Sequence, residues 1–139
     1  MNSKRLFVTK SDVFTLSVLF SKEGDLEIKT IKEVPAEELD KWERCDVEFI
    51  LPDFGTAKGI MSQSSIIDNG QQVFVGSRFN NNLLTALARK WNLKTEEGEE
   101  IPLDFSKLNE LRPDIVLTFI SLLIEKLNKE GLYEALLST

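Results

Sequence analysis

The chain has 139 residues, of which 42% are hydrophobic and 29% are charged, and its formal net charge is −6. This length and apolar content suffice to bury one core, so we expect a single domain over residues 1–139. The acidic balance disfavours nucleic-acid binding, which needs clustered lysine and arginine, and the absence of histidine from the sequence excludes Ser-His-Asp and Cys-His nucleophiles and the common zinc sites.

The sequence contains a single cysteine, Cys45, so no disulfide can form within the chain. We interpret it as a structural thiol rather than a nucleophile, because no histidine is present to act as its base. The longest apolar run, residues 115–124, is about half the length of a membrane-crossing helix. Lys10 and Asp12 interrupt the apolar stretch that a signal peptide would need. We therefore expect a cytoplasmic protein that neither crosses a membrane nor is secreted.

The N-terminal half has the pattern of a small antiparallel sheet. Residues 13–20 form a β-rich run with period two and predict a first strand. Residues 26–30 alternate apolar with charged side chains, so they predict a second strand that pairs with the first through a turn at Gly24. A third strand is predicted in CDVEFIL, which ends at Pro52.

Three helical segments are predicted before residue 100. Pro35 followed by AEELDKWER predicts a short helix, with Leu39 and Trp42 on its inner face. The segment TAKGIMSQSSII has helical spacing and ends before a turn at DNG, residues 68–70. From about Phe74 to about Leu93 a longer helix is predicted. Its apolar positions at helical intervals are Phe79, Leu83, Leu84, Leu87 and Trp91.

The last predicted helix begins at Pro113, where the missing N–H of proline is tolerated, and is followed by a C-terminal cap at Gly131. Its apolar stripe comprises Val116, Phe119, Ile120, Leu123, Ile124 and Leu127. A stripe of this kind must pack on a neighbour. The predicted fold class is α+β, with a small antiparallel sheet in the β-rich part (about 12–52) packed against a helical part (about 55–137).

The motifs that resemble chemical sites fail on their spacing. FGTAKG lacks the spacing of a phosphate-binding loop, and EEGEE at residues 96–100 lacks the alternating acids and the twelfth-position glutamate of a calcium loop. An enzyme whose carboxylates meet in a cleft stays open as an alternative class, although no motif selects a pair. We expect no catalytic, cofactor-binding or metal-binding residues.

Two features indicate contacts with a partner. Trp91 stands beside a polar loop, where a large ring serves either as a lid on the core or as a contact anchor. The segment after Gly131 is apolar on one face, and it either folds back as a short helix or binds a partner. The candidate partner-binding residues are Trp91, Leu132, Tyr133, Leu136 and Leu137.

The order of several segments resembles a group of small tailed-bacteriophage proteins, the tail assembly chaperones and related tail-morphogenesis proteins. The segments are VEFILPDFG, LLTALARKWNL, EEGEEIPL and DFSKLNELRPDIVLTFISLLIEKL. Together they cover roughly Val47 to Leu127. The pattern positions carried over are Trp91, Gly98, Pro102, Leu108, Leu111 and Pro113.

The resemblance implies a protein of the host cytoplasm that binds unassembled tape measure or tail-tube protein without catalysis. A structural protein of the phage neck, tail or baseplate, present in the virion, stays open as the alternative. Association of the chain with itself is also left open. Gly98 and Pro102 are expected to shape the loop, while Leu108 and Leu111 are expected to bury a short helix.

Overall fold

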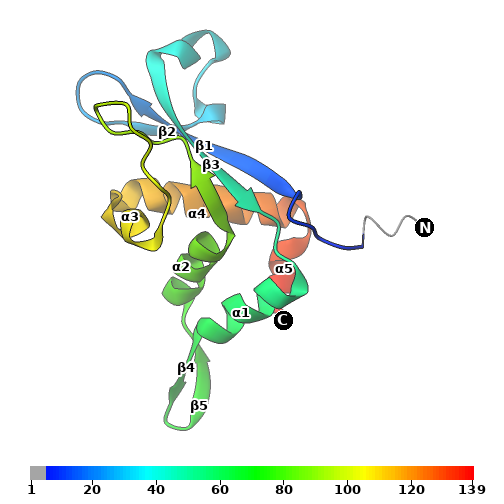
Figure 1. Ribbon diagram of the computed structural model, residues 1–139. Coiled ribbons are helices and arrows are strands. Elements are labelled where there is room, and N and C mark those ends of the chain that lie inside the picture. The colour runs from blue at the N-terminus through cyan, green and yellow to red at the C-terminus, as the bar shows by residue number, and fades with distance from the viewer. Residues whose placement is uncertain (1–5) are drawn as a thin grey trace.

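The computed structural model describes residues 6–139, apart from the side chain of Phe105. It confirms the predicted α+β class, with a four-stranded sheet, a separate two-stranded hairpin and five α-helices within that range (Figure 1). The strands are β1 (Val13–Ser21), β2 (Ile28–Thr30), β3 (Trp42–Ile50), β4 (Ser65–Asp68), β5 (Gln71–Phe74) and β6 (Ala88–Trp91). The helices are α1 (Phe54–Gln63), α2 (Gly76–Leu87), α3 (Phe105–Glu110), α4 (Pro113–Lys129) and α5 (Leu132–Leu137), with 3₁₀ turns η2 (Ile31–Glu33) and η3 (Ala36–Lys41).

The main sheet has the order β2-β1-β3-β6 with antiparallel pairing throughout. The predicted hairpin of the first two strands and the predicted third strand are therefore confirmed. The helix predicted after Pro35 is wrong in type and extent, since η3 is a 3₁₀ turn that ends at Lys41 and Trp42 is the first residue of β3. Trp42 pairs with Ser21 at the end of β1, so strand pairing overrides the local helical pattern.

One face of the sheet packs against α4, which lies across it in Figure 1. Phe49 is fully buried at the centre of this contact. Its ring stacks on Phe14 at 5.7 Å between centroids and meets Phe119 of α4 at 6.5 Å. The predicted apolar stripe of α4 faces the core: Phe119, Ile120, Leu123 and Leu127 are buried, and Val116 and Ile124 are partly buried against them.

The helix predicted from residue 74 to residue 93 is too long at its C-terminal end. It corresponds to α2, which ends at Leu87, and the chain then enters β6. Trp91 is therefore on a strand, where it pairs with Val47 of β3. The apolar spacing from Leu87 to Trp91 fits a helix, but β3 has a free edge there, and its ladder of hydrogen bonds favours an extended chain.

The helix predicted in TAKGIMSQSSII is also too long. It ends at Gln63, and Ile66 and Ile67 belong to β4, which pairs with β5. The predicted turn at DNG is confirmed, and it connects these two strands. Asn69 and Gly70 have φ values of 51° and 78°, and two successive positive φ values are typical of the tight turn of a two-residue hairpin.

The C-terminal segment folds back onto the domain, which decides between the two alternatives for it. Gly131 has a φ of 71° and stops α4 as predicted, since glycine adopts this conformation without steric cost. The chain then forms α5, whose Leu136 is buried. No helix in the described part of the chain has both the length and the apolar character needed to cross a membrane.

Candidate partner-binding site

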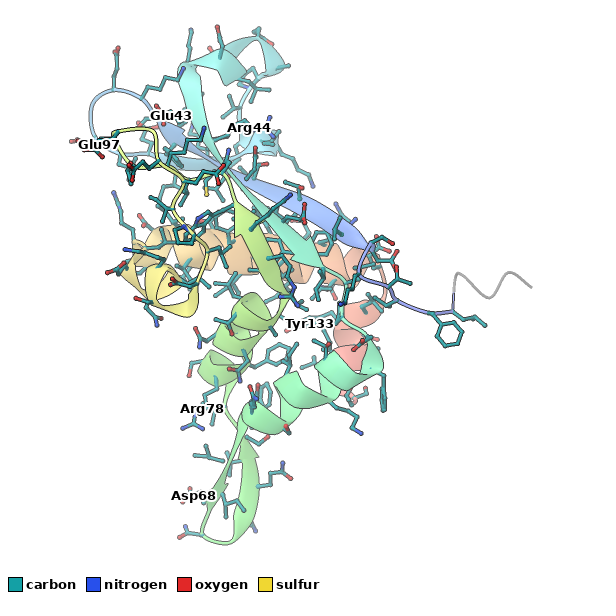
Figure 2. All side chains as sticks on the ribbon, in the orientation of Figure 1. Glu43, Arg44, Asp68, Arg78, Glu97 and Tyr133 are labelled. Carbon is teal, nitrogen blue, oxygen red and sulfur yellow. The ribbon has the colours of Figure 1, made fainter. Side chains whose placement is uncertain are left out.

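The predicted partner-binding residues do not form one surface. Tyr133 lies between α2 and α5 in Figure 2, and its ring meets Phe79 edge-on at 6.1 Å. Leu136 is buried and Leu132 is partly buried against the core, whereas Leu137 is exposed. Trp91 lies apart from all four, beside the loop that follows β6. The tail therefore contributes mainly to the core, although Leu132 and Leu136 also line a hollow of about 400 Å³ against α1, and Trp91 lines a separate hollow.

The hollow beside Trp91 has a volume of about 360 Å³. Its walls come from β6, from the loop between β6 and α3, and from the end of α3. The apolar lining residues are Trp91, Leu93, Ile101, Pro102 and Leu111, and the polar ones are Thr95, Glu100, Lys107 and Glu110. We call this hollow the Trp91 pocket. An apolar floor with charged side chains around it suits a bulky apolar group from a partner.

Backbone hydrogen bonds hold the loop of the Trp91 pocket in place. The Trp91 indole N–H donates to the carbonyl oxygen of Ile101 at 2.5 Å, and the Ile101 N–H donates to the carbonyl oxygen of Leu93 at 3.0 Å. At the tip, Gly98 has a φ of 83°, and its N–H donates to the carbonyl oxygen of Thr95 at 2.9 Å. These bonds fold residues 93–101 into a narrow loop. The positive φ at its tip explains why a glycine stands in the acidic segment.

The start of this loop is tied to the sheet by Asn92. Its side-chain carbonyl oxygen accepts from the Asp46 backbone N–H at 2.8 Å, and its backbone N–H donates to the Asp46 carbonyl oxygen at 3.2 Å. Asn92 therefore fixes the direction in which the chain leaves Trp91. The Trp91 pocket is thus built on the edge of the sheet rather than on a free loop.

The Trp91 pocket lies beside an acidic stretch of the sequence. Residues 94–110 contain two lysines and six acidic residues, which gives a net charge of −4 out of −6 for the whole chain. The glutamates at 96, 97, 99 and 100 are exposed. Among the described residues, no group of three or more acidic or cysteine side chains is arranged to hold a metal ion. Lys107 pairs with Glu110 at 3.0 Å, and the remaining excess of acidic side chains in this segment favours a positively charged partner.

Cys45 lies on the buried face of β3, and its side chain is 1% exposed. Burial, with a smaller contribution from the charge of Asp46, raises the pKa of the thiol to about 12. The thiolate, which is the reactive form, is therefore scarce at neutral pH. These properties agree with the interpretation of Cys45 as a structural thiol.

We predict that Cys45 reacts with iodoacetamide only when the protein unfolds. In the native protein at pH 8 the alkylation rate should be at least about a hundredfold below that of a free cysteine, because the thiol is both buried and protonated. Mass spectrometry of samples quenched over time, with and without denaturant, measures this ratio. Rapid alkylation of the native protein would contradict the prediction.

The sequence reasoning missed a second exposed surface, the β4–β5 hairpin. Figure 1 shows this hairpin projecting from the domain beyond α1 and α2. Four of its eight strand residues are large hydrophobic side chains exposed to solvent: Ile66, Ile67, Val73 and Phe74. Ile67 is the most exposed, at 79%. We call this hairpin the β4–β5 arm. The Asn69-Gly70 turn between two β-rich runs was the signal that could have identified it.

The base of the β4–β5 arm is held by the buried Ser64. Its hydroxyl donates to the Ile60 carbonyl oxygen at 2.6 Å and accepts from the side-chain amide of Asn82 at 3.2 Å. Its carbonyl oxygen accepts from the Val75 N–H at 2.8 Å, which closes the arm. Since Ser64 bonds to both α1 and α2, the arm is fixed in its projecting direction.

Comparison of the chain with models of known families, with curated proteins and with solved structures finds no match.

Proposed function

We propose that this protein is a non-catalytic assembly chaperone or adaptor that binds an unassembled partner protein through the β4–β5 arm. The observation that carries the proposal is the arm itself, a projecting hairpin with apolar side chains on both faces. Ile66 and Val73 are opposite each other and share one face, while Ile67 and Phe74 lie on the other. Large exposed apolar groups on a projecting element are typical of protein interaction sites.

The arm also offers unpaired backbone groups. β4 and β5 pair only with each other in the described part of the chain, so each has one open edge. An open edge can receive an extended segment of another protein by strand addition. An unassembled partner with an unpaired strand would satisfy both the apolar and the backbone groups of the arm.

The expected strength of this contact suits a chaperone that must release its partner. Full burial of one large apolar side chain is worth about 1.5–3 kcal/mol, so covering four that are already partly shielded contributes on the order of 4 kcal/mol. Association costs about 4–15 kcal/mol in lost freedom of motion. Because the gain from the four side chains barely meets this cost, stable binding needs further contacts. Loss of a few of those further contacts would release the partner.

The resemblance to phage tail assembly chaperones supports a specific partner, the unassembled tape measure or tail-tube protein. In that setting the arm would cover apolar surface of the partner until the tail polymerises. The alternative of a structural neck, tail or baseplate protein shares the interaction surface but differs in its final location.

We predict that Ile67→Asp reduces binding of the partner by at least about tenfold, because it places a charge in the apolar contact. Co-expression of tape measure or tail-tube protein with the wild-type chain should give a soluble complex, and Ile67→Asp should leave the partner insoluble. Leu117→Asp is the matched control, since Leu117 is also exposed (60%) but lies on α4. Its complex should resemble that of the wild type.

Two results would overturn the proposal. One is an absence of any complex or solubility effect with the wild-type chain, and the other is equal binding by Ile67→Asp and wild type. Mass spectrometry of purified particles separates the two locations, because a chaperone should be missing from the virion and a structural protein should be present in stoichiometric amount.

A further inference from the structure

The segment before β1 has the chemistry of a ligand for an acidic apolar pocket. Leu6 and Phe7 are strongly exposed, with Phe7 at 70%. Residues 1–12 contain three cations, Lys4, Arg5 and Lys10, and one acidic residue, Asp12. The segment therefore combines an exposed apolar ring with a positive charge, although the chain as a whole has a net charge of −6.

The base of this segment is a turn attached to the domain, since the Asp12 carbonyl oxygen accepts from the Leu51 N–H at 3.0 Å. The Thr9 N–H donates to Oδ2 of Asp12 at 2.7 Å, and the Asp12 N–H donates to the Thr9 carbonyl oxygen at 3.0 Å. Val8 and Lys10 line a hollow against β3 and α1. Phe7 is therefore presented at the point where the chain leaves the domain.

We propose that Phe7 of one copy of this protein inserts into the Trp91 pocket of a second copy. The pocket offers an apolar floor for the ring. The net charge of −4 over residues 94–110 complements the net charge of +2 over residues 1–12. The apolar ring matches the apolar floor of the pocket, and the basic segment matches the acidic loop. This complementarity favours the Trp91 pocket over an acidic surface that has no apolar hollow.

The two features lie at opposite ends of α4, so the contact joins different molecules. Lys126 Nζ lies 5.6 Å above the ring of Phe14, which places the start of β1 at the C-terminal end of α4. Leu111 of the Trp91 pocket lies two residues before Pro113, at the N-terminal end. Seventeen helical residues span about 25 Å. Figure 1 shows residues 6–12 leaving the domain on the side of α5, away from α3.

A contact between two different surfaces is head-to-tail, and it repeats from one copy to the next. Each bound copy still has one free Phe7 segment or one free Trp91 pocket. Such an interface gives a ring if the rotation between copies closes and an open filament otherwise. The proposal therefore predicts growth with protein concentration rather than a simple dimer. Salt should weaken the assembly, because part of the attraction is electrostatic.

Two variants that each lack one half of the contact test the proposal. Phe7→Asp removes the inserted ring, and the double change Glu100→Lys with Glu110→Lys reverses two exposed charges at the Trp91 pocket. Each variant alone should be monomeric at concentrations where the wild type assembles, with association weakened at least about tenfold. Analytical ultracentrifugation measures the mass. Phe54→Asp is the matched control, because Phe54 is equally exposed (71%) and should be dispensable for assembly.

An equimolar mixture of the two variants gives the decisive result. The intact Phe7 segment of the charge-reversed variant can bind the intact Trp91 pocket of Phe7→Asp, so a 1:1 complex should form and should not grow further. A monomeric wild type at all accessible concentrations, assembly of Phe7→Asp like that of the wild type, or a mixture that stays monomeric would each overturn the proposal. These measurements involve no other protein, so they are independent of the proposed chaperone function.

Discussion

Replacing Phe49 by alanine is expected to lower the free energy of unfolding by about 3–5 kcal/mol, which is the usual cost of removing a buried aromatic ring. Phe49 is 0% exposed and contacts rings from two other elements, Phe14 of β1 and Phe119 of α4. The change leaves a cavity between the sheet and the helix that covers it, and neither side can collapse freely. Denaturant unfolding followed by far-UV circular dichroism measures the difference.

Phe54→Ala is the matched control for this prediction. Phe54 is 71% exposed on the first turn of α1, with the Lys58 ammonium 5.3 Å above its ring. Its removal should change the free energy of unfolding by no more than about 0.5 kcal/mol, as for most exposed positions. Equal effects of the two changes would mean that the centre of the core is not at the contact between β3 and α4.

The parts of the fold that the sequence predicted correctly are those whose local pattern agrees with their surroundings. α4 has a proline at its start, an apolar stripe and a glycine after its end, and all three fit a helix lying on a sheet. The alternating residues Phe14, Leu16, Val18 and Phe20 of β1 likewise belong to the core, although Leu19 on the other face is also buried. Elements of this kind need little information from distant parts of the chain.

The incorrect predictions occur where a distant strand decides the conformation. Residues 88–91 continue the apolar spacing of α2, yet they pair with β3, which precedes them by about forty residues. Trp42 likewise starts a strand because of its partner Ser21. Local periodicity carries no information about a free strand edge elsewhere, so these boundaries were assigned to helices.

The candidate site was predicted only in part for the same reason. Trp91 and Gly98 were identified as features of interest, but the Trp91 pocket also needs Leu93, Ile101 and Leu111 brought together by the loop and by α3. No periodicity relates these positions. The β4–β5 arm, by contrast, had a local signal in Asn69-Gly70, and the helical spacing before it concealed that signal.

Trp91→Ala is expected to lower the free energy of unfolding by about 3 kcal/mol, at the low end for a large aromatic residue because the ring is only half-buried. The change removes the packing of the indole against the core and the hydrogen bond to Ile101 that holds the acidic loop. Thermal or denaturant unfolding measures the effect. The sequence left two roles for Trp91, lid of the core and contact anchor, and its position in the structure predicts that it performs both.

Trp91→Phe separates those roles, because phenylalanine keeps most of the packing and loses the indole N–H. Stability should fall by about 1 kcal/mol, the usual value of one hydrogen bond, while the loop of residues 93–101 loses its bond to the floor of the Trp91 pocket. Faster hydrogen exchange at the Ile101 and Thr95 amides should report that loosening. Trp42→Phe is the control, since Trp42 is also half-buried but does not line the Trp91 pocket. Unchanged exchange in Trp91→Phe would mean that the loop is held by its backbone bonds alone, and that Trp91 contributes to the pocket only through its ring.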